Sequence, residues 1–380
     1  MPIKIMTIFG TRPDAIKMAS VVLELQNFPG KVDVVVAVTG QHREMLQQVL
    51  KTFNITPKYN LDIMKPGQSL TQITTRSLDG LSKLIESEKP DMILAQGDTT
   101  TTFTASLAAF YNKVSIGHVE AGLRTDSKYD PFPEEINRRL TSVLADLHFA
   151  PTQMAMDNLL AEGVPAEKIS VTGNTVIDTL LTVADRDFIF DDPVLNRVGT
   201  AERRLILVTA HRRENWGTPM EDISNAVKKI AVENNDIDII FALHKNPVVR
   251  DTITGILSGI ENIYLIEPPD YVPFVHLLKK AYLVLTDSGG VQEEAPSLGK
   301  PVLVMRKTTE RPEGVLAGTS RLVGTQIDNI YDAVHELIHS KSAYDHMAQT
   351  INPFGDGNAS KIIRGIIFQY YGLDEEKNES

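Results

Sequence analysis

Two doubly wound α/β domains, each built on a parallel sheet covered by helices on both faces, are the fold class that the sequence predicts. Short, almost continuously apolar segments such as IKIMTIF and LILVTA alternate with longer segments of helical periodicity. Continuous apolar strands separated by helices are typical of a parallel sheet that is buried on both faces. The length of 380 residues exceeds what one compact core usually holds, which indicates two domains.

Strand candidates follow one another along the whole chain. In the first half they are IKIMTIF, VDVVVAVT, MILAQG, VSIGHVE, LHFAP and ISVT. Helical periodicity lies between them, for example over 13–27, 40–52, 69–88 and 99–111. In the second half the strand candidates are LILVTA, IDIIFALH, NIYLIE, YLVLTD and PVLVM. This order of elements predicts one βα sheet in each half.

The polar segment 184–204 interrupts this alternation, so the join between the domains is expected before or within it. We expect an N-terminal domain over 1–175 and a C-terminal domain over 176–357. A final helix over about 358–380 is expected to pack back on the first domain, and a cleft between the domains is expected to hold the active site.

Composition excludes several classes of protein. The net charge of −11 argues against a nucleic-acid-binding surface, which needs clustered positive charge. The chain has no cysteine, which excludes a disulfide framework and thiolate chemistry. No apolar run approaches the ~20 residues that span a bilayer, and MPIKIMTIFG lacks the features of a signal peptide. We therefore expect a cytoplasmic protein without a membrane or nucleic-acid partner.

Acidic side chains follow two neighbouring strand candidates, where ligands bind in open parallel sheets. Asp98 comes directly after MILAQG, and Glu120 ends VSIGHVE. Glu134 follows Pro133 in the first turn of a predicted helix. The alternatives are helix capping for Asp98 and an ion pair of Glu134 with Arg138 one turn later. Glu120 is harder to explain as surface, because it stands at the end of a buried strand.

Basic side chains also gather at the strand ends of this acidic protein. Arg12 and Lys17 follow the first strand in GTRPDAIK, where a cation beside a helix start suits a phosphate. This segment is not a G-x-G-x-x-G loop, so the dinucleotide fingerprint is absent. In the second half the basic strand-end residues are His211, Arg212, Arg213, His244, Lys245 and Arg311. Their recurrence in both halves predicts a site for a small polyanion such as a nucleoside diphosphate.

The segment TDSGGVQEE is the clearest phosphate candidate of the second half. A strand leads into Ser288, Gly289 and Gly290 and then into a helix, which lets backbone N–H groups approach a phosphate. Glu294 lies one turn into that helix, where a carboxylate can accept hydrogen bonds from ribose hydroxyls.

The HELIH segment, 335–339, matches a zinc-protease motif, but no third ligand accompanies it and no metal site is predicted.

Several ordered motifs together resemble the non-hydrolysing UDP-N-acetylglucosamine 2-epimerases. They are GTRPDAIKM, TGQHREML, QGDTTTTF, HVEAGLR, PFPEEINRR, TAHRREN, HKNP, TDSGGVQEEAPSLGKPVL, TERPEG and NPFGDG. The resemblance implies two Rossmann-like domains in the GT-B arrangement. It also implies interconversion of UDP-GlcNAc and UDP-ManNAc without a cofactor, which supplies ManNAc units to bacterial surface polysaccharides, and it implies a homodimer.

The resemblance also implies roles for individual residues. Catalytic roles fall to Asp98, Glu120, Glu134 and His211, with the three carboxylates around the sugar. The implied substrate-binding residues are Arg12, Lys17, Arg138, Phe274, Ser288, Gly289, Gly290, Glu294 and Arg311. Among these, Phe274 would lie by the uracil, Glu294 by the ribose and Arg311 by the pyrophosphate.

In some members of that family the substrate also acts as an activator beside the active site. The matching positions are Gln41, His42, Arg212 and His244. Gly67 departs from the arginine expected in such members, so the resemblance leaves this regulation open. Two milder departures are Asp14, where glutamate is usual, and Ser20, where proline is usual.

The chemistry of such a reaction explains why carboxylates and cations occur together. The hydrogen at C2 of the sugar is not next to a carbonyl, so simple deprotonation is out of reach. Elimination of UDP to a glycal and re-addition remains, with proton transfer on both faces and cations on the departing diphosphate. The alternatives are a GT-B glycosyltransferase, a hydrolysing epimerase that releases free ManNAc, and a UDP-sugar sensor without catalysis.

Overall fold

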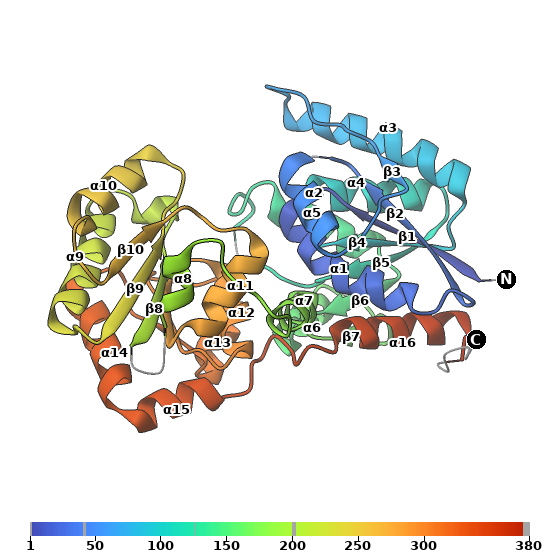
Figure 1. The fold of residues 1–380 in the computed structure, drawn as a ribbon. Coiled ribbons are helices and arrows are strands. Elements are labelled where there is room, and N and C mark those ends of the chain that lie inside the picture. Colours follow the sequence, from blue (N-terminus) through green and yellow to red (C-terminus); the bar gives the residue numbers. More distant parts are fainter. Residues whose placement is uncertain (1, 41–42, 126, 200–202, 375–380) are drawn as a thin grey trace. The chain divides into compact units, whose positions relative to one another are not determined.

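The computed structural model describes residues 2–40, 43–125, 127–199 and 203–374 (Figure 1). The chain forms two compact units. Unit 1 comprises Met1–Thr179 together with Gly355–Ser380, and unit 2 comprises Leu180–Phe354. The division into folding domains at 175/176 and 357/358 stays a prediction.

Unit 1 is a parallel sheet between layers of helices. Within the described residues its seven strands have the order β3-β2-β1-β4-β5-β6-β7. The strands are β1 Ile3–Phe9, β2 Val32–Val38, β3 Tyr59–Asn60, β4 Met92–Gln96, β5 Ser115–Val119, β6 Leu147–Ala150 and β7 Ile169–Val171. The helices are α1 Arg12–Gln26, α2 Arg43–Thr52, α3 Leu70–Glu88, α4 Thr100–Tyr111, α5 Glu134–Leu144, α6 Gln153–Ala161, η1 Ala166–Lys168 and α16 Ala359–Tyr371. Helix α7, Thr175–Ala184, begins in unit 1 and ends in unit 2.

Unit 2 repeats this design. Within the described residues its six parallel strands have the order β10-β9-β8-β11-β12-β13. The strands are β8 Arg204–Thr209, β9 Ile237–Ala242, β10 Ile263–Ile266, β11 Leu283–Thr286, β12 Val302–Val304 and β13 Ser320–Leu322. The helices are α8 Pro193–Arg197, η2 Arg213–Asn215, α9 Thr218–Glu233, α10 Pro247–Leu257, α11 Tyr271–Lys280, α12 Gly289–Ser297, α13 Pro312–Ala317, α14 Ile327–His339 and α15 Lys341–Gln349.

The predicted fold class, two doubly wound parallel α/β sheets, is confirmed. The apolar strands are continuous because both faces of each sheet are covered: every residue of β4 and β11 is buried. The sequence reading missed β3 and β13, which are two and three residues long and carry polar side chains. Strands this short have too few residues for a recognisable pattern.

The C-terminal helix α16 packs on α1 in unit 1 (Figure 1). Arg364 donates from Nε to Glu24 Oε1 at 2.8 Å, and Phe368 meets Phe28 edge-on with ring centroids 5.3 Å apart.

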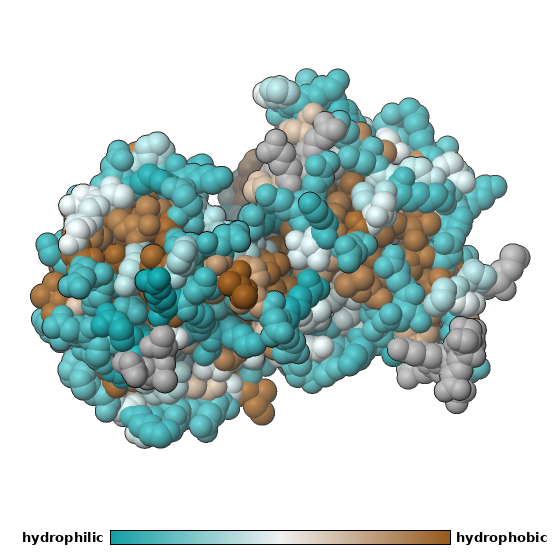
Figure 2. All heavy atoms as spheres, viewed as in Figure 1, coloured by the Kyte–Doolittle hydropathy of each residue, from teal (hydrophilic) through white to brown (hydrophobic). Residues whose placement is uncertain are grey.

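Figure 2 shows hydrophilic side chains over most of the visible surface, with apolar areas between them. Among the described residues, no helix combines the length and hydropathy that a membrane crossing requires.

Candidate active site

The order of the strands creates one switch point in each unit, where two adjacent strands lead to opposite sides of the sheet. In unit 1 the switch point lies between β1 and β4, which pair from Ile5↔Met92 to Ile8↔Ala95. Ligands of doubly wound sheets bind beyond the carboxyl ends of such strands. The turn after β1 leads to Arg12, and the turn after β4 carries Asp98. Both were selected from the sequence on this ground.

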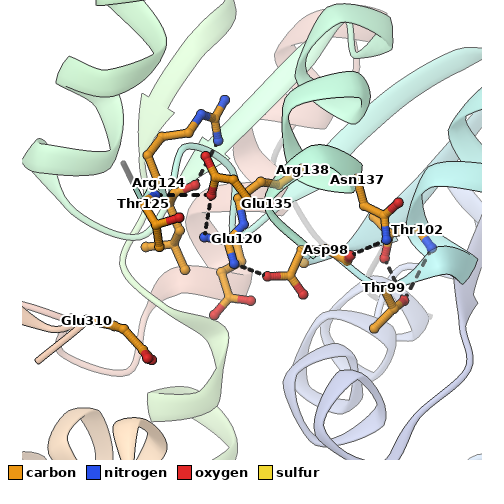
Figure 3. A network of polar contacts seen from close by, with 12 residues as sticks. Asp98, Thr99, Thr102, Glu120, Arg124, Thr125, Glu135, Asn137, Arg138 and Glu310 are labelled. Atoms are coloured by element: carbon orange, nitrogen blue, oxygen red, sulfur yellow. Dashed lines mark hydrogen bonds and ion pairs between the residues drawn. The ribbon is translucent and has the colours of Figure 1, made fainter. Parts of the chain in front are cut away.

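Asp98 is held by α5 (Figure 3). Arg138 donates from Nη2 to Asp98 Oδ2 at 2.5 Å, and Asn137 donates from Nδ2 to the carbonyl oxygen of Asp98 at 3.0 Å. The capping interpretation of Asp98 is wrong, because Thr99 is the N-cap of α4 and accepts from the backbone N–H of Thr102 at 3.3 Å. The carboxylate of Asp98 is therefore not needed to cap α4.

Glu120 is buried directly after β5, in a left-handed backbone conformation with φ 64°. Its carboxylate accepts from Nε2 of Gln96 at 2.6 Å, from Nδ2 of Asn174 at 3.1 Å and from the ammonium of Lys17. The left-handed region is uncommon for a residue with a side chain. Donors on β4, on α1 and in the turn after β7 thus fix this carboxylate at the end of its strand.

Glu134 and Glu135 open α5 and have different surroundings. Burial raises the pKa of the half-buried Glu134, and the charge of Asp98 raises it further although Arg138 opposes this. Glu135 is buried and accepts from the backbone N–H of Thr125 at 3.0 Å and from Nε of Arg139 at 2.7 Å. Glu135 therefore anchors the loop after β5 (Figure 3).

The predicted pairing of Glu134 with Arg138 does not describe the structure. The guanidinium of Arg138 lies instead 2.5 Å from Asp98 Oδ2 and 3.5 Å from Glu135 Oε2. Glu134 is thereby left for another role at the start of α5, where the helix dipole favours an anion. Arg124, at the other end of the loop, donates to Glu162 at 2.9 and 2.6 Å. Arg124 and Glu135 are thus used to anchor this loop, whereas Glu134 at its end stays a catalytic candidate.

Two titratable residues in this region were not selected from the sequence. Asp14 is buried, and burial together with the nearby charge of Asp98 raises its pKa to about 7. It forms a capping box with Thr11 and accepts from Thr99 Oγ1 at 3.4 Å. His118 is buried under the same turn, donates from Nε2 to the carbonyl of Gly97 at 2.7 Å, and has its pKa lowered by burial to about 3. A capping-box pattern in TRPD was the only sequence signal for Asp14.

Arg12 stands at the first position of α1, between Thr11 and the adjacent Pro13. It is half-buried, and the structure gives it no hydrogen bond or ion pair with any described residue. Lys17, one turn further along α1, pairs with Glu120. The start of α1 thus presents one cation that protein carboxylates leave unneutralised within the described chain.

The switch point of unit 2 lies between β8 and β11 and is organised by a buried carboxylate. Asp287 follows β11, is fully buried, and accepts at Oδ2 from the backbone N–H groups of His211 and Arg212 at 2.9 and 2.8 Å. Asn215 adds a bond from Nδ2 at 3.0 Å, and His211 Nδ1 lies 3.1 Å from Oδ1. Burial alone would raise the pKa of Asp287, but its bonds to His211 and Arg212 lower it below the ordinary value.

The start of α12 has the features of an anion site. Ser288 is the N-cap but makes no side-chain cap bond. A Cβ on Gly289 would lie 3.7 Å from Nη2 of Arg212 and 4.0 Å from Cζ of Arg311, and nothing lies within 4 Å of a Cβ on Gly290. Two guanidinium groups therefore flank backbone N–H groups at a helix start, as phosphate binding requires.

Three arginines of unit 2 are paired with carboxylates. Arg212 donates to Glu310 at 3.1 and 3.2 Å. Arg311 pairs with buried Glu293, and Arg306 lies 2.6 Å from Glu214. Of the two acidic residues of α12, Glu293 is therefore the one that forms an ion pair with Arg311. The predicted ribose ligand Glu294 accepts from the hydroxyl of Tyr271 at 3.2 Å.

The remaining predicted residues lie near these elements or outside the described chain. Phe274 is partly buried on α11 and packs against the core of unit 2. The ring of His244 stacks on His211 with centroids 5.8 Å apart, and burial together with His211 lowers its pKa. Gln41 and His42 lie outside the described residues. Of the predicted activator residues, the structure therefore places only Arg212 and His244.

The HELIH histidines lie on α14, and their rings stack with centroids 4.1 Å apart. Within the described ranges, no group of three or more potential ligands could hold a metal ion. Both histidines are exposed, and we assign them no role.

Comparison with known proteins gives a single family. A family model described as UDP-N-acetylglucosamine 2-epimerase matches residues 24–367. The UDP-N-acetylglucosamine 2-epimerase of Bacillus subtilis is 52% identical over 378 residues, which cover 100% of this chain and 98% of that protein.

Two solved structures extend the comparison. The UDP-GlcNAc 2-epimerase of Neisseria meningitidis, solved bound to UDP-GlcNAc, is 49% identical with a TM-score of 0.86 and covers 97% of this chain and 100% of its own. The enzyme of Methanocaldococcus jannaschii, in complex with UDP-GlcNAc and UDP, is 34% identical with a TM-score of 0.76 and covers 97% and 100%.

Proposed function

The chain belongs to the UDP-N-acetylglucosamine 2-epimerase family, and we propose that it interconverts UDP-GlcNAc and UDP-ManNAc without net hydrolysis. The observation that carries this proposal is the group of Asp98, Glu120 and Glu134 around the β1–β4 switch point of unit 1. Inversion of a carbon by proton removal and return needs acid and base groups on both faces of the sugar. A sugar transferase has no such need for a carboxylate cluster.

Elimination and re-addition is the mechanism that we propose. The C2 proton passes to a carboxylate while the bond between C1 and the UDP oxygen breaks, which leaves a 2-acetamidoglucal and UDP. Return of a proton to the opposite face of C2 and re-attack of UDP at C1 give the epimer. Atoms and charges balance within this sequence, and UDP serves as leaving group and nucleophile in turn. The M. jannaschii enzyme was solved with both UDP-GlcNAc and UDP, which supports this proposal.

The carboxylates differ in their suitability for the two proton transfers. Glu134 has a pKa raised by burial and by Asp98, which favours its protonated form as the proton donor. Asp98 is held by Arg138 at 2.5 Å, and we propose that it takes the role of base. Glu120 is oriented by Gln96, Asn174 and Lys17, which would hold its carboxylate in place beside the sugar. We therefore propose Glu134 as the group that gives the proton and Asp98 as the group that takes it.

We assign the UDP part of the substrate to the start of α12 and to the cations beside it. Backbone N–H groups at Ser288 and Gly289, with Arg311, would hold the β-phosphate, and His211 would protonate or stabilise the departing oxygen. Arg12 would add a charge-assisted bond to the diphosphate. Glu294 would accept from the ribose hydroxyls, and Phe274 would contact the uracil.

Proton NMR of the purified protein with UDP-GlcNAc alone tests the proposal. We expect signals of UDP-ManNAc to grow to a constant ratio with UDP-GlcNAc, without free UDP. Release of free ManNAc with UDP would indicate the hydrolysing type of epimerase instead. An unchanged spectrum would contradict the epimerase assignment and favour a glycosyltransferase that waits for an acceptor.

The cellular context is proposed from the same family membership. We propose that the product supplies ManNAc units for cell-surface polysaccharide and that the protein acts in the cytoplasm as a homodimer. Helices α4 and α5 pack together in unit 1 and leave Tyr111 63% and Val143 83% exposed, so they offer an apolar surface to a second copy. Light scattering after size-exclusion chromatography checks this: a mass of one chain would contradict the dimer.

A further inference from the structure

We propose that Asn174 is a positioning residue for Glu120, and that Gly355 in the NPFGDG segment supports the turn that presents Asn174. The inference rests on the proposed function, in which Glu120 acts on the sugar. NPFGDG, residues 352–357, was part of the sequence resemblance but has no role in the reaction as described so far. The contacts that this segment makes within unit 1 give it a role in the reaction.

Asn174 performs two tasks with the two ends of one amide. It is 2% exposed in the turn between β7 and α7. Its Nδ2 donates to Glu120 Oε1 at 3.1 Å, and its Oδ1 accepts from the backbone N–H of Val176 at 3.2 Å in the first turn of α7. The bond to the helix start fixes the rotamer, and the fixed rotamer aims the NH₂ group at the carboxylate. A neutral amide can do both without adding charge.

Glu120 needs such support because of where it stands. With φ 64° it has left the geometry of β5, so the strand no longer determines where its side chain points. Gln96 holds Oε2 at 2.6 Å, whereas Asn174 and Lys17 share Oε1. Lys17 carries a flexible side chain, so the buried amide of Asn174 is the rigid donor on Oε1. Small displacements of a reacting group cost large factors in rate.

Gly355 is packed against the turn that carries Asn174. A Cβ at this position would lie 3.2 Å from Cα of Gly173 and 3.5 Å from the backbone N of Asn174, and Gly355 has φ 124°. Two glycines therefore allow backbone to approach backbone, and any side chain on Gly355 would push the turn. The C-terminal part of the chain thus reaches the support of Glu120 from a distant position in the sequence.

The next residues fasten this segment to α7. Asp178, in the first turn of that helix, accepts from the backbone N–H groups of Ala359 at 3.2 Å and Ser360 at 2.8 Å, at the start of α16. Asn174 and Asp178 lie one turn apart, so the segment is fixed to the helix that Asn174 caps. We therefore expect a displacement of Gly355 to displace Asn174 as well.

A purely structural role for Asn174, as a helix cap alone, is the alternative. The substitution Asn174→Asp separates the two, because aspartate keeps an oxygen for the N–H of Val176 but loses the donor to Glu120 and places a second negative charge beside it. We expect kcat to fall at least ~100-fold, as for a misplaced catalytic group, with KM and UDP affinity within about threefold of the wild type. The acidic limb of the pH–kcat profile should move to higher pH, because a like charge raises a carboxylate's pKa.

Gly355→Ala tests the second half of the proposal and remains informative should Asn174→Asp fail to fold. We expect about a tenfold loss of kcat, since the added methyl displaces the Asn174 turn. The matched control is Gly372→Ala, also in unit 1: Gly372 has φ 65°, but a Cβ there meets nothing within 4 Å. Gly372 also has a positive φ, although in the left-handed region that other residues can adopt, and it lacks the contact, so the kcat of Gly372→Ala should stay near the wild-type value.

The outcomes separate this inference from the proposed function. Wild-type protein that makes no UDP-ManNAc would refute the function itself. With active wild-type protein, an Asn174→Asp variant of unchanged kcat and pH profile would overturn the role of Asn174. A Gly355→Ala variant as active as Gly372→Ala would overturn the role of Gly355.

Discussion

The two switch points differ in which charge they hold in place. At the β1–β4 point of unit 1, carboxylates are oriented by donors: Glu120 accepts from three side chains, and Asp98 accepts from Arg138. At the β8–β11 point of unit 2, cations are held by carboxylates, with Arg212 on Glu310 and Arg311 on Glu293. The same arrangement of strands therefore presents the proposed acid–base groups in one unit and the proposed phosphate-binding groups in the other.

This difference indicates a division of labour. We propose that carboxylates which accept from neutral donors, such as Gln96 and Asn174, keep their positions when substrate binds. Arg212 and Arg311 have carboxylate partners with which a diphosphate would compete. Under the proposed function, UDP at the start of α12 would thus exchange one set of anions for another.

The largest effect is expected from the carboxylates of unit 1. Asp98→Asn, Glu120→Gln and Glu134→Gln should each lower kcat at least ~100-fold, because each removes an acid–base group. UDP affinity should change far less, since none of these three carboxylates is assigned to UDP. Glu24→Gln serves as the control, because this carboxylate on α1 pairs with Arg364 on α16. Near-native turnover in all three variants would show that the site has been placed wrongly.

The next effect concerns the diphosphate. His211→Ala and Arg12→Ala should weaken UDP binding by about 1.5–3 kcal/mol each, the usual contribution of a hydrogen bond to a charged group. Arg213→Ala is the control for His211, because Arg213 is an exposed cation in the same turn whose guanidinium lies 5.9 Å from the ring of Trp216. Isothermal calorimetry measures the affinity. Unchanged binding in both variants would count against these assignments.

A smaller effect concerns stability and pH. The pKa of Asp14 is raised to about 7 in the folded protein, so the native state binds its proton more tightly than the unfolded state does. Stability from this group is present at low pH and is lost as pH rises towards 7, with a slope of at most ~1.4 kcal/mol per pH unit. Asp14→Asn should lack this decline. Urea unfolding of both proteins across that range gives the comparison, and parallel curves would contradict it.

The smallest effect tests the competition within unit 2. Glu310→Gln removes a carboxylate that is 38% exposed and pairs with Arg212, so UDP should bind more tightly by ~0.2–1 kcal/mol, as expected for an exposed ion pair. The control is Glu336→Gln, which breaks the similarly exposed pair of Arg321 and Glu336. Weaker UDP binding in Glu310→Gln would mean that Glu310 assists the ligand.

The sequence predicts the fold well because the strands are apolar on both faces. It also selects Asp98 and Glu120 as candidate site residues, since each directly follows a predicted strand. It does not identify Gln96, Asn174 or Asp287, because their roles depend on partners far away in the chain. A buried amide or aspartate in a turn looks like ordinary capping until the fold shows what faces it.

The sequence likewise only partly distinguishes the role of Glu134 from that of Glu135. Adjacent carboxylates at a helix start look alike, and family resemblance alone favours Glu134. The structure separates them physically, since Glu135 is used by Thr125 and Arg139. The pairing of Arg138 with Asp98 could not be predicted, because it joins α5 to the turn after β4.

The central claim is that the C2 proton leaves and the C1–O bond breaks within one catalytic cycle. UDP-GlcNAc labelled with ¹⁸O in the bridging position should be incubated with the protein in D₂O and followed by ¹H and ³¹P NMR. The account predicts deuterium at C2 of UDP-ManNAc and movement of ¹⁸O into non-bridging positions of the β-phosphate. Product that retains hydrogen at C2 with ¹⁸O unmoved would contradict the elimination mechanism.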